Sequence, residues 1–317
     1  MVSILVPVYN ASRYLRECVK SLTGQTYTDL QIVLINDGST DDSWDILQEL
    51  ARHDQRLEIY SQSNSGVAAT RNRLLDKARG EFVLFVDSDD WIELDAIEFL
   101  LNLQTKDDYD VVMFQINRKQ SHDFHFNQGQ VVKEFLKHQS FRGSLCDKMI
   151  KRELFNGLMI DESVGYGEDA LLVWQVLQRV HNVYVSGKML YHYRVNMKSI
   201  SHQYFDGNKF SAYAVWDAIC SDTDKDWPQY RDIAHARFAS EMVQILHSAV
   251  LSRSKYKYDY NISLLQQEIR RDGYKMRKTG ISSNKMVFYA WIISRNYWLV
   301  KKMRRLVRSI DKYINVS

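Results

Sequence analysis

The chain has 317 residues, of which 45% are hydrophobic and 26% are charged, and it contains two prolines. This composition excludes a disordered or fibrous protein and allows one large domain, or one domain with an appendage. The net charge of +3 is unevenly placed, because acids are concentrated in residues 37–54 and 87–95 whereas bases gather near the C-terminus.

The three cysteines, Cys18, Cys146 and Cys220, are scattered without a paired spacing, so neither a disulfide framework nor a zinc site is expected. The first residues lack the basic and apolar regions of a signal peptide. The apolar run at 286–293 is shorter than the roughly 20 residues of a membrane-spanning helix. We therefore expect a cytoplasmic protein without a transmembrane segment.

The predicted elements of the first hundred residues alternate between β-rich runs and amphipathic stretches, a pattern typical of a parallel sheet flanked by helices. Apolar residues recur at helical spacing in 15–22, 47–51 and 67–78. The strands predicted between them are residues 2–8, 31–36, 57–60 and 82–86. The expected fold class is therefore α/β.

Further elements are a helix at 96–103, a strand at 111–116, a loop at 119–130, a helix at 173–180 and strands at 183–185 and 189–193. Beyond Tyr204 the β-rich runs vanish and the sequence becomes helical in character. We therefore predict a catalytic domain over residues 1–201 and a helical C-terminal region over 202–317.

Polar segments follow the first two strands, at the edge where open α/β sheets bind ligands. In Pro7-Val8-Tyr9-Asn10 the aromatic ring of Tyr9 could stack on a nucleobase; the alternative is an ordinary turn with Asn10 or Ser12 as a helix N-cap. In Asn36-Asp37-Gly38-Ser39-Thr40-Asp41 a carboxylate could accept the imide N–H of uracil; the alternative is a capped turn that starts the next helix.

A third segment, Asp87-Ser88-Asp89-Asp90, places three carboxylates directly after the apolar strand 82–86. Such close like charges destabilise the fold unless a cation neutralises them, and a hard divalent ion with oxygen ligands is the natural partner. The alternative is a solvated acidic turn.

Four motifs, in this order and spacing, resemble those of the inverting family 2 glycosyltransferases with the GT-A fold, in particular enzymes of bacterial surface-polysaccharide synthesis. They are Pro7-Val8-Tyr9-Asn10, Asn36-Asp37-Gly38-Ser39-Thr40-Asp41, Asn64-x-Gly66 with Arg71-Asn72, and Asp87-x-Asp89. The resemblance covers residues 1–201. It implies that Pro7, Tyr9 and Asp37 hold the base, that Asp87 faces the ribose or the metal, and that Asp89 binds the metal, Mn²⁺ or Mg²⁺.

Arg71 could reach the pyrophosphate from the start of its helix, since guanidinium donors match paired oxygens; a surface salt bridge is the alternative. In Gly165-Tyr166-Gly167-Glu168-Asp169, the resemblance assigns Asp169 as the general base, whereas Glu168 could hold acceptor hydroxyls. The alternative is that both acids only complement a helix dipole.

Weaker signals surround Tyr191-His192-Tyr193-Arg194 and Ser199-Ile200-Ser201. Arg194 is a candidate phosphate contact, and His192 is either a third metal ligand or structural. Lys148 is either a phosphate or acceptor contact or an exposed lysine. The expected donor contacts are Pro7, Tyr9, Asn10, Asp37, Asn64, Arg71, Asp87, Ser88 and Arg194.

The resemblance implies a reaction that moves a hexosyl or N-acetylhexosaminyl group from a UDP-sugar to a carbohydrate acceptor, with a lipid-linked glycan as one candidate. An NAD-dependent dehydrogenase would need G-x-G-x-x-G after the first strand, where this chain has Pro7-Val8-Tyr9-Asn10. A pyrophosphorylase would need a glycine-rich phosphate loop near the N-terminus. The remaining alternative is a catalytically silent module that binds a sugar nucleotide or a glycan.

The C-terminal segment from Asn284 combines aromatic and aliphatic residues with a basic cluster. This combination suits a helix lying on the anionic inner face of the cell membrane; a helix packed on the core with a solvated basic end is the alternative. Nucleic acid is a poorer fit, because no reading motif accompanies the bases.

Overall fold

The computed structural model describes residues 1–194, 205, 207–252 and 258–303. The chain divides into two compact units. The first comprises Met1–Glu162 and Asp169–Val195, and the second comprises Ser163–Glu168 and Asn196–Ser317. The predicted boundary at residue 201 and the segment Ser199-Ile200-Ser201 lie outside the described residues.

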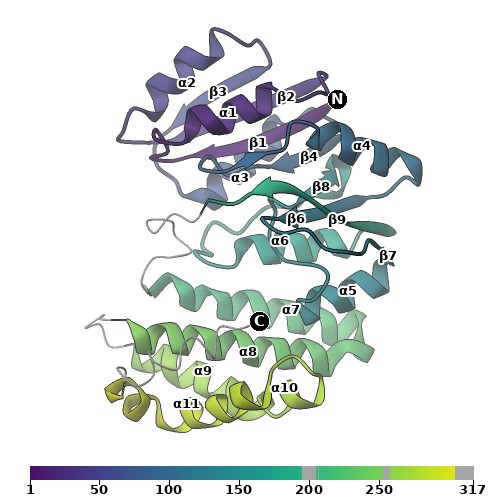
Figure 1. The fold of residues 1–317 in the computed structure, drawn as a ribbon. Coiled ribbons are helices and arrows are strands. Elements are labelled where there is room, and N and C mark those ends of the chain that lie inside the picture. The colour runs from purple at the N-terminus through teal and green to yellow at the C-terminus, as the bar shows by residue number, and fades with distance from the viewer. Residues whose placement is uncertain (195–204, 206, 253–257, 304–317) are drawn as a thin grey trace. The chain divides into compact units, whose positions relative to one another are not determined.

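Nine strands of the described chain form one sheet in the first unit (Figure 1). The strands are β1 (Val2–Val8), β2 (Leu30–Asp37), β3 (Leu57–Gln62), β4 (Phe82–Phe85), β5 (Trp91–Ile92), β6 (Val111–Ile116), β7 (Phe124–Asn127), β8 (Lys148–Lys151) and β9 (Asn182–His192). Their order is β3-β2-β1-β4-β8-β6-β9-β5, and β7 also pairs with β9. Strands β1 to β4 are parallel and β6 is parallel to β9, whereas β5, β7 and β8 run antiparallel to their neighbours.

The helices of the first unit are α1 (Leu15–Thr23), α2 (Ser43–Ala51), α3 (Val67–Lys77), α4 (Ala96–Lys106), α5 (Gln128–Lys137), the 3-10 helix η1 (Arg152–Phe155) and α6 (Glu168–Leu177). The expected α/β class, a mostly parallel sheet with flanking helices, is confirmed. Strands 2–8 and 111–116 have the predicted bounds, and the other strands predicted before residue 90 differ by one or two residues at their ends.

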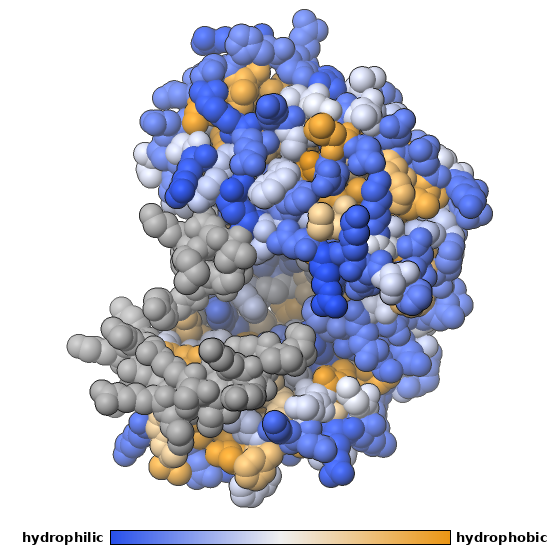
Figure 2. All heavy atoms as spheres, viewed as in Figure 1, coloured by the Kyte–Doolittle hydropathy of each residue, from blue (hydrophilic) through white to orange (hydrophobic). Residues whose placement is uncertain are grey.

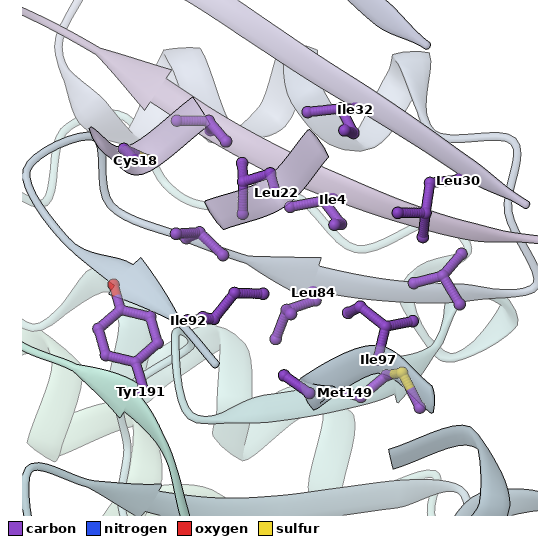
Figure 3. Close-up of a cluster of buried hydrophobic side chains, with 14 of the residues drawn as sticks. Ile4, Cys18, Leu22, Leu30, Ile32, Leu84, Ile92, Ile97, Met149 and Tyr191 are labelled. Carbon is purple, nitrogen blue, oxygen red and sulfur yellow. The ribbon is translucent and has the colours of Figure 1, made fainter. Parts of the chain in front are cut away.

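The central strands are buried on both faces, as expected of parallel strands covered by helices. Ile4 of β1 lies in one buried cluster with Cys18 and Leu22 of α1 and Ile97 of α4 (Figure 3). On the opposite face, Leu5 is also fully buried, where α3 packs on β1. This double covering fixes the positions of β1, β2 and β4, whose carboxyl ends lie at one edge because Val8 pairs with Asn36 and Leu5 with Phe85.

Two predictions for the middle of the chain were wrong. Residues 119–130 are not only a loop, since β7 pairs with β9 and α5 begins at Gln128. The expected strands 183–185 and 189–193 form the single strand β9, which is irregular where it passes Met113 and Gln115 of β6. The antiparallel strand β8 was not predicted, because its apolar core is only Met149-Ile150.

The second unit is helical in its described part, as predicted for the region beyond Tyr204. Its elements are η3 (Gly207–Ser211), α7 (Ala212–Asp226), η4 (Pro228–Tyr230), α8 (Arg231–Leu251), α9 (Asp259–Asp272), α10 (Lys275–Lys278) and α11 (Asn284–Lys302). Helix α8 contacts all the other four helices, and Phe238, Met242 and Leu246 are buried along it. No helix within the described ranges is long and apolar enough to cross a membrane.

Candidate active site

The loops that follow β1 and β2 are tied together by hydrogen bonds. The Asn10 side-chain oxygen accepts from the backbone N–H of Thr40 at 2.8 Å, and the N–H of Asn10 donates to Ser39 Oγ at 3.0 Å. Asn10 adopts a left-handed conformation, with φ 49°, which asparagine tolerates better than most residues. The structure therefore gives Asn10 a role in holding the two loops, while its predicted donor contact stays a prediction.

The capping alternative for the first loop was wrong, because the N-cap residue of α1 is Tyr14 rather than Asn10 or Ser12. Pro7 is half-buried at the end of β1, and Tyr9 is 52% exposed. The Tyr9 ring is therefore accessible for stacking. In the second loop, Asp41 accepts from the N–H groups of Ser12 and Ser43, so its role is to bind the loops together beside α2.

Asp37 anchors the loop that leads into α3. Its carboxylate accepts hydrogen bonds from Gln62 Nε2 at 2.8 Å and from the N–H groups of Ser65 and Gly66 at 2.8 and 2.9 Å. Asp37 is only 4% exposed. The neighbouring Asn64 is exposed. A carboxylate has about four lone-pair positions, so the predicted hydrogen bond from a base would use the position that remains.

Arg71 joins residues that the sequence places far apart. It lies on α3 and is 7% exposed. Its Nη1 lies 2.5 Å from Oδ1 of Asp169, and its Nη2 lies 3.7 Å from Oδ1 of Asp87. Asp87 follows β4 and Asp169 lies in the first turn of α6. The alternative of a surface salt bridge was wrong, because this guanidinium is buried between the two carboxylates.

The acidic segment after β4 is not a solvated turn. Ser88 and Asp90 are buried, and Asp87 and Asp89 are half-buried. Asp90 accepts from Tyr191 Oη and from the N–H of Arg194, both at 2.7 Å. Burial, with the nearby charges of Asp87 and Asp89, raises the pKa of Asp90 to about 7 although these hydrogen bonds oppose the shift.

Sequence reasoning groups Asp90 with the carboxylates that a cation would neutralise, and it misses the contact with Tyr191. The Tyr191 hydroxyl also accepts from the N–H of Asp87 at 3.1 Å, so one buried hydroxyl fixes both ends of the acidic segment. A tyrosine that ends a β-rich run is the only signal in the sequence, and it does not identify a partner a hundred residues away.

Asp169 is the predicted general base. Burial, together with the charge of Asp87, raises its pKa, and the guanidinium of Arg71 opposes this shift. A carboxylate with a raised pKa takes up a proton more readily near neutral pH. Glu168 begins α6, as predicted, but it groups with residues 163–167 in the second unit, and its predicted role toward acceptor hydroxyls stays a prediction.

Arg194 contacts two aromatic rings and two acidic residues of the first unit. Its guanidinium lies between the rings of Tyr14 and Trp91, at 4.6 and 4.7 Å from their centroids, and it bonds to the carbonyl of Asp89 at 2.9 Å and to Glu17 at 2.5 Å. Arg194 therefore lies beside the acidic segment that follows β4. Its phosphate contact stays a prediction.

Two further candidates have structural partners. His192 forms a hydrogen bond with Glu93 Oε1 at 2.7 Å and stacks on Trp91 with ring centroids 4.9 Å apart. Of the two roles that the sequence left open, these contacts fit the structural one. Lys148 is not exposed, contrary to one prediction. Its ammonium is buried beside Asp147 and the carbonyl of Ser144, and burial lowers the pKa of Lys148.

Asp87 and Asp89 fit a divalent cation of the predicted kind. Within the described ranges no cluster of three or more His, Cys, Asp or Glu side chains could hold a metal ion by itself. Mg²⁺, however, is commonly held by one or two carboxylates together with substrate phosphates. Within the same ranges no hydrogen-bond donor contacts the Asp89 carboxylate, whereas the Asp90 carboxylate has two. The Asp89 carboxylate therefore has more lone-pair positions left for a cation than the Asp90 carboxylate has, and metal binding by Asp87 and Asp89 stays a prediction.

Comparison with protein families shows to which family the chain belongs. The model of glycosyl transferase family 2 matches residues 3–161, and the chain belongs to this family. It is 28% identical to EpsH of Bacillus subtilis over 302 residues, which cover 90% of this chain and 84% of EpsH. It is 31% identical to the glycosyltransferase GlyG of Streptococcus pneumoniae over 65% of this chain and 74% of GlyG, but it spans only 31% of the longer GlyA of the same organism.

Solved structures share the fold. Residues 1–349 of Staphylococcus aureus TarS superpose with a TM-score of 0.69 at 21% identity, covering 96% of this chain and 91% of TarS 1–349. The same TarS segment has been solved with UDP-GlcNAc, with a TM-score of 0.67 at 20% identity over 96% and 91% of the two chains. The mannosyltransferase PcManGT of Pyrobaculum calidifontis, solved with GDP-Man and Mn²⁺, has a TM-score of 0.57 at 16% identity over 93% and 87%. The GT-A-like fold expected from the motifs is thereby confirmed.

Proposed function

We propose that this glycosyltransferase moves a hexosyl or N-acetylhexosaminyl group from a UDP-sugar to a hydroxyl group of a carbohydrate acceptor, with inversion at the anomeric carbon. The observation that carries the proposal is the contact of Arg71 with both Asp169 and Asp87. This contact joins a candidate general base, Asp169, to the acidic segment at the end of β4. A glycosyltransferase needs a base for the acceptor hydroxyl and a site for the donor diphosphate, both within reach of the same sugar.

Two observations support a uridine donor. TarS has been solved with UDP and with UDP-GlcNAc, and Asp37 of this chain offers a buried acceptor at the edge of the sheet. The relatives EpsH, GlyG and TarS come from bacteria. We further propose an acceptor on a bacterial polysaccharide or its lipid-linked precursor, by analogy with these relatives.

In the proposed reaction, the Asp169 carboxylate takes the proton of the acceptor hydroxyl. The hydroxyl oxygen then forms a bond to the anomeric carbon on the face opposite the nucleotide. The bond between that carbon and the diphosphate oxygen breaks, and its electron pair leaves on UDP. A single displacement of this kind inverts the anomeric centre and needs one base.

Negative charge develops on the departing diphosphate, so positive charge near Asp87 would stabilise the transition state. Arg71 supplies a buried, permanently charged guanidinium at that place. A divalent cation held by Asp87 and Asp89 would add Lewis-acid stabilisation of the leaving group.

The test is the release of UDP from a panel of UDP-sugars with Mn²⁺ or Mg²⁺, measured for the native chain and for Asp89→Ala and Asp169→Ala. We expect metal-dependent release from one donor, which both substitutions abolish. Asp76→Ala is the matched control, because Asp76 is exposed on the same helix as Arg71 and should not affect the rate.

Release that persists in Asp169→Ala would contradict the assignment of the base. If nucleotides bind but no donor is turned over, even with a mixture of glycan acceptors, a catalytically silent binding module explains the fold better.

A further inference from the structure

Helix α11 has a hydrophobic side that the described part of the chain leaves uncovered. Its inward residues, including Ala290, Ile293 and Val300, are buried against α8 and α9. Its outward residues Phe288, Trp291, Trp298 and Leu299 are 63%, 53%, 50% and 56% exposed. Within the described ranges, one side of this helix is packed in the second unit and the other side is exposed.

The exposed side chains lie on both parts of the helix, which is interrupted at Asn296, where φ is −131° and ψ is 40°. Phe288 and Trp291 precede the interruption and stack with ring centroids 6.3 Å apart. Trp298 and Leu299 follow it. Figure 2 shows hydrophobic side chains at the surface of the C-terminal helices. Large aromatic residues exposed in such number commonly mark a contact surface.

The charges of α11 all have one sign. Lys285, Arg295, Lys301 and Lys302 are its charged residues, and the helix contains no Asp or Glu. Two of these cations lie beside exposed aromatic rings, with Arg295 5.0 Å from the Trp291 centroid and Lys301 5.6 Å from the Trp298 centroid. The apolar side and the positive charge therefore occupy the same surface.

We propose that α11 binds the surface of an anionic lipid bilayer, with Phe288, Trp291, Trp298 and Leu299 at the level of the headgroups and acyl chains. Tryptophan rings are favoured at this level, and lysine and arginine can extend toward the lipid phosphates. Each basic residue near an anionic leaflet adds to the attraction. This inference does not depend on the proposed transferase reaction.

Charge disfavours a second copy of the chain as the occupant. Two α11 helices packed through this side would bring like charges together without any acid on either helix to compensate. An anionic leaflet, in contrast, supplies the opposite charge over the whole length of the helix.

The test is flotation of the full chain with vesicles of phosphatidylcholine alone or mixed with phosphatidylglycerol. We expect binding to the mixed vesicles that weakens at high salt. Lys301→Ala/Lys302→Ala should weaken binding by about 25-fold, from about fivefold for each lysine. Trp291→Ser/Trp298→Ser should abolish binding.

Matched controls come from exposed sites of the first unit. Arg118→Ala/Lys119→Ala removes two basic residues of an exposed loop, and Leu94→Ser/Met159→Ser removes two exposed apolar side chains. Both controls should bind vesicles as the native chain does, and all variants should release UDP at the native rate in solution. Absence of native binding to anionic vesicles, or unchanged binding by both α11 variants, overturns the proposal. If the tryptophan variant instead changes a dimer into a monomer, α11 is a self-association surface and the proposal is also wrong.

Discussion

Tyr191 connects two aspartates through one hydroxyl group, donating to Asp90 and accepting from the N–H of Asp87. Tyr191→Phe should lower the free energy of unfolding by about 1–3 kcal/mol, because a buried carboxylate loses a donor. It should also lower donor hydrolysis by roughly 10-fold to 100-fold, since Asp87 loses its positioning contact. Urea unfolding and UDP release measure the two effects.

Tyr184→Phe separates these effects. Tyr184 is also buried and also donates to an aspartate, Asp123, at 2.5 Å, but that aspartate is not part of the candidate site. Asp123 is exposed and water can replace the lost donor, so we expect a smaller loss of stability, with native activity. Equal activity of the two variants would show that Tyr191 stabilises the fold without positioning the site.

The proposed role of Asp169 as the base predicts how the reaction depends on pH. As a base it must be ionised, and its pKa is raised, so kcat/KM should rise with pH through a pKa above the ordinary value of about 3.9. Arg71→Met removes the positive partner that opposes the shift. In this variant the rise of kcat/KM with pH should therefore occur at higher pH, in addition to any loss of rate.

Lys77→Met is the control for that measurement, because Lys77 is an exposed cation at the end of the same helix. Its rate profile should match the native one at saturating metal. If kcat/KM of Arg71→Met rises over the same pH range as that of the native chain, Asp169 is not the titrating base.

At the scale of elements, α5 begins with a capping box. The Asn127 side chain accepts from the N–H of Gln130, and the Gln130 side chain accepts from the N–H of Asn127, both at 3.0 Å. Asn127→Ala should therefore cost about 1 kcal/mol in the free energy of unfolding. Asn102→Ala, at an exposed position within α4, should not destabilise the chain, since alanine favours helix interiors. Urea unfolding compares the two variants.

The same segment shows why sequence reasoning was limited here. Strands such as Val2–Val8 are continuous apolar runs, so their pattern predicts them, whereas β7 alternates phenylalanine with polar residues among histidines and amides and gives no clear period. The capping box formed by Asn127 and Gln130 could have predicted the start of α5, but the polar composition of this segment favoured a loop. Strand β8 depends on pairing with β4 and β6, and long-range pairing leaves no local pattern.

The candidate site, like the fold, could be predicted from the sequence only in part. The motifs give residue types at strand ends, and parallel topology brings Tyr9, Asp37 and Asp87 to one edge. The sequence does not show which carboxylates already accept hydrogen bonds from other groups of the protein. The internal contacts of Arg194, Lys148 and Asp90 come from folding, and a charged residue near a motif looks the same in sequence whether it binds substrate or protein.

At the scale of the whole molecule, the chain passes from the first unit to the second and back within a few residues of the candidate base. Residues 163–168 belong to the helical unit, where the N–H of Tyr166 donates to Ser211 Oγ at 3.0 Å. Asp169 begins the return to the sheet unit.

Gly167→Ala tests this arrangement. Gly167 has φ 91°, a conformation that strains any other residue, so the substitution should cost about 1–2 kcal/mol of stability. Because Asp169 is two residues away, turnover should also fall while nucleotide binding persists. Gly157→Ala is a matched control, with φ 71° and open space around the added carbon, and it should lose stability without losing turnover.

The three internal hydrogen bonds of Asp37 have a consequence for nucleotide discrimination. A carboxylate with about one open lone-pair position can accept one N–H group. Uracil offers a single imide N–H, guanine presents two adjacent donors that would need both oxygens, and the ring nitrogen of cytosine at the equivalent place carries no proton. In the proposed role of Asp37, the hydrogen bonds that close the loop before α3 thus leave one acceptor position, which suits the uridine donor that we propose.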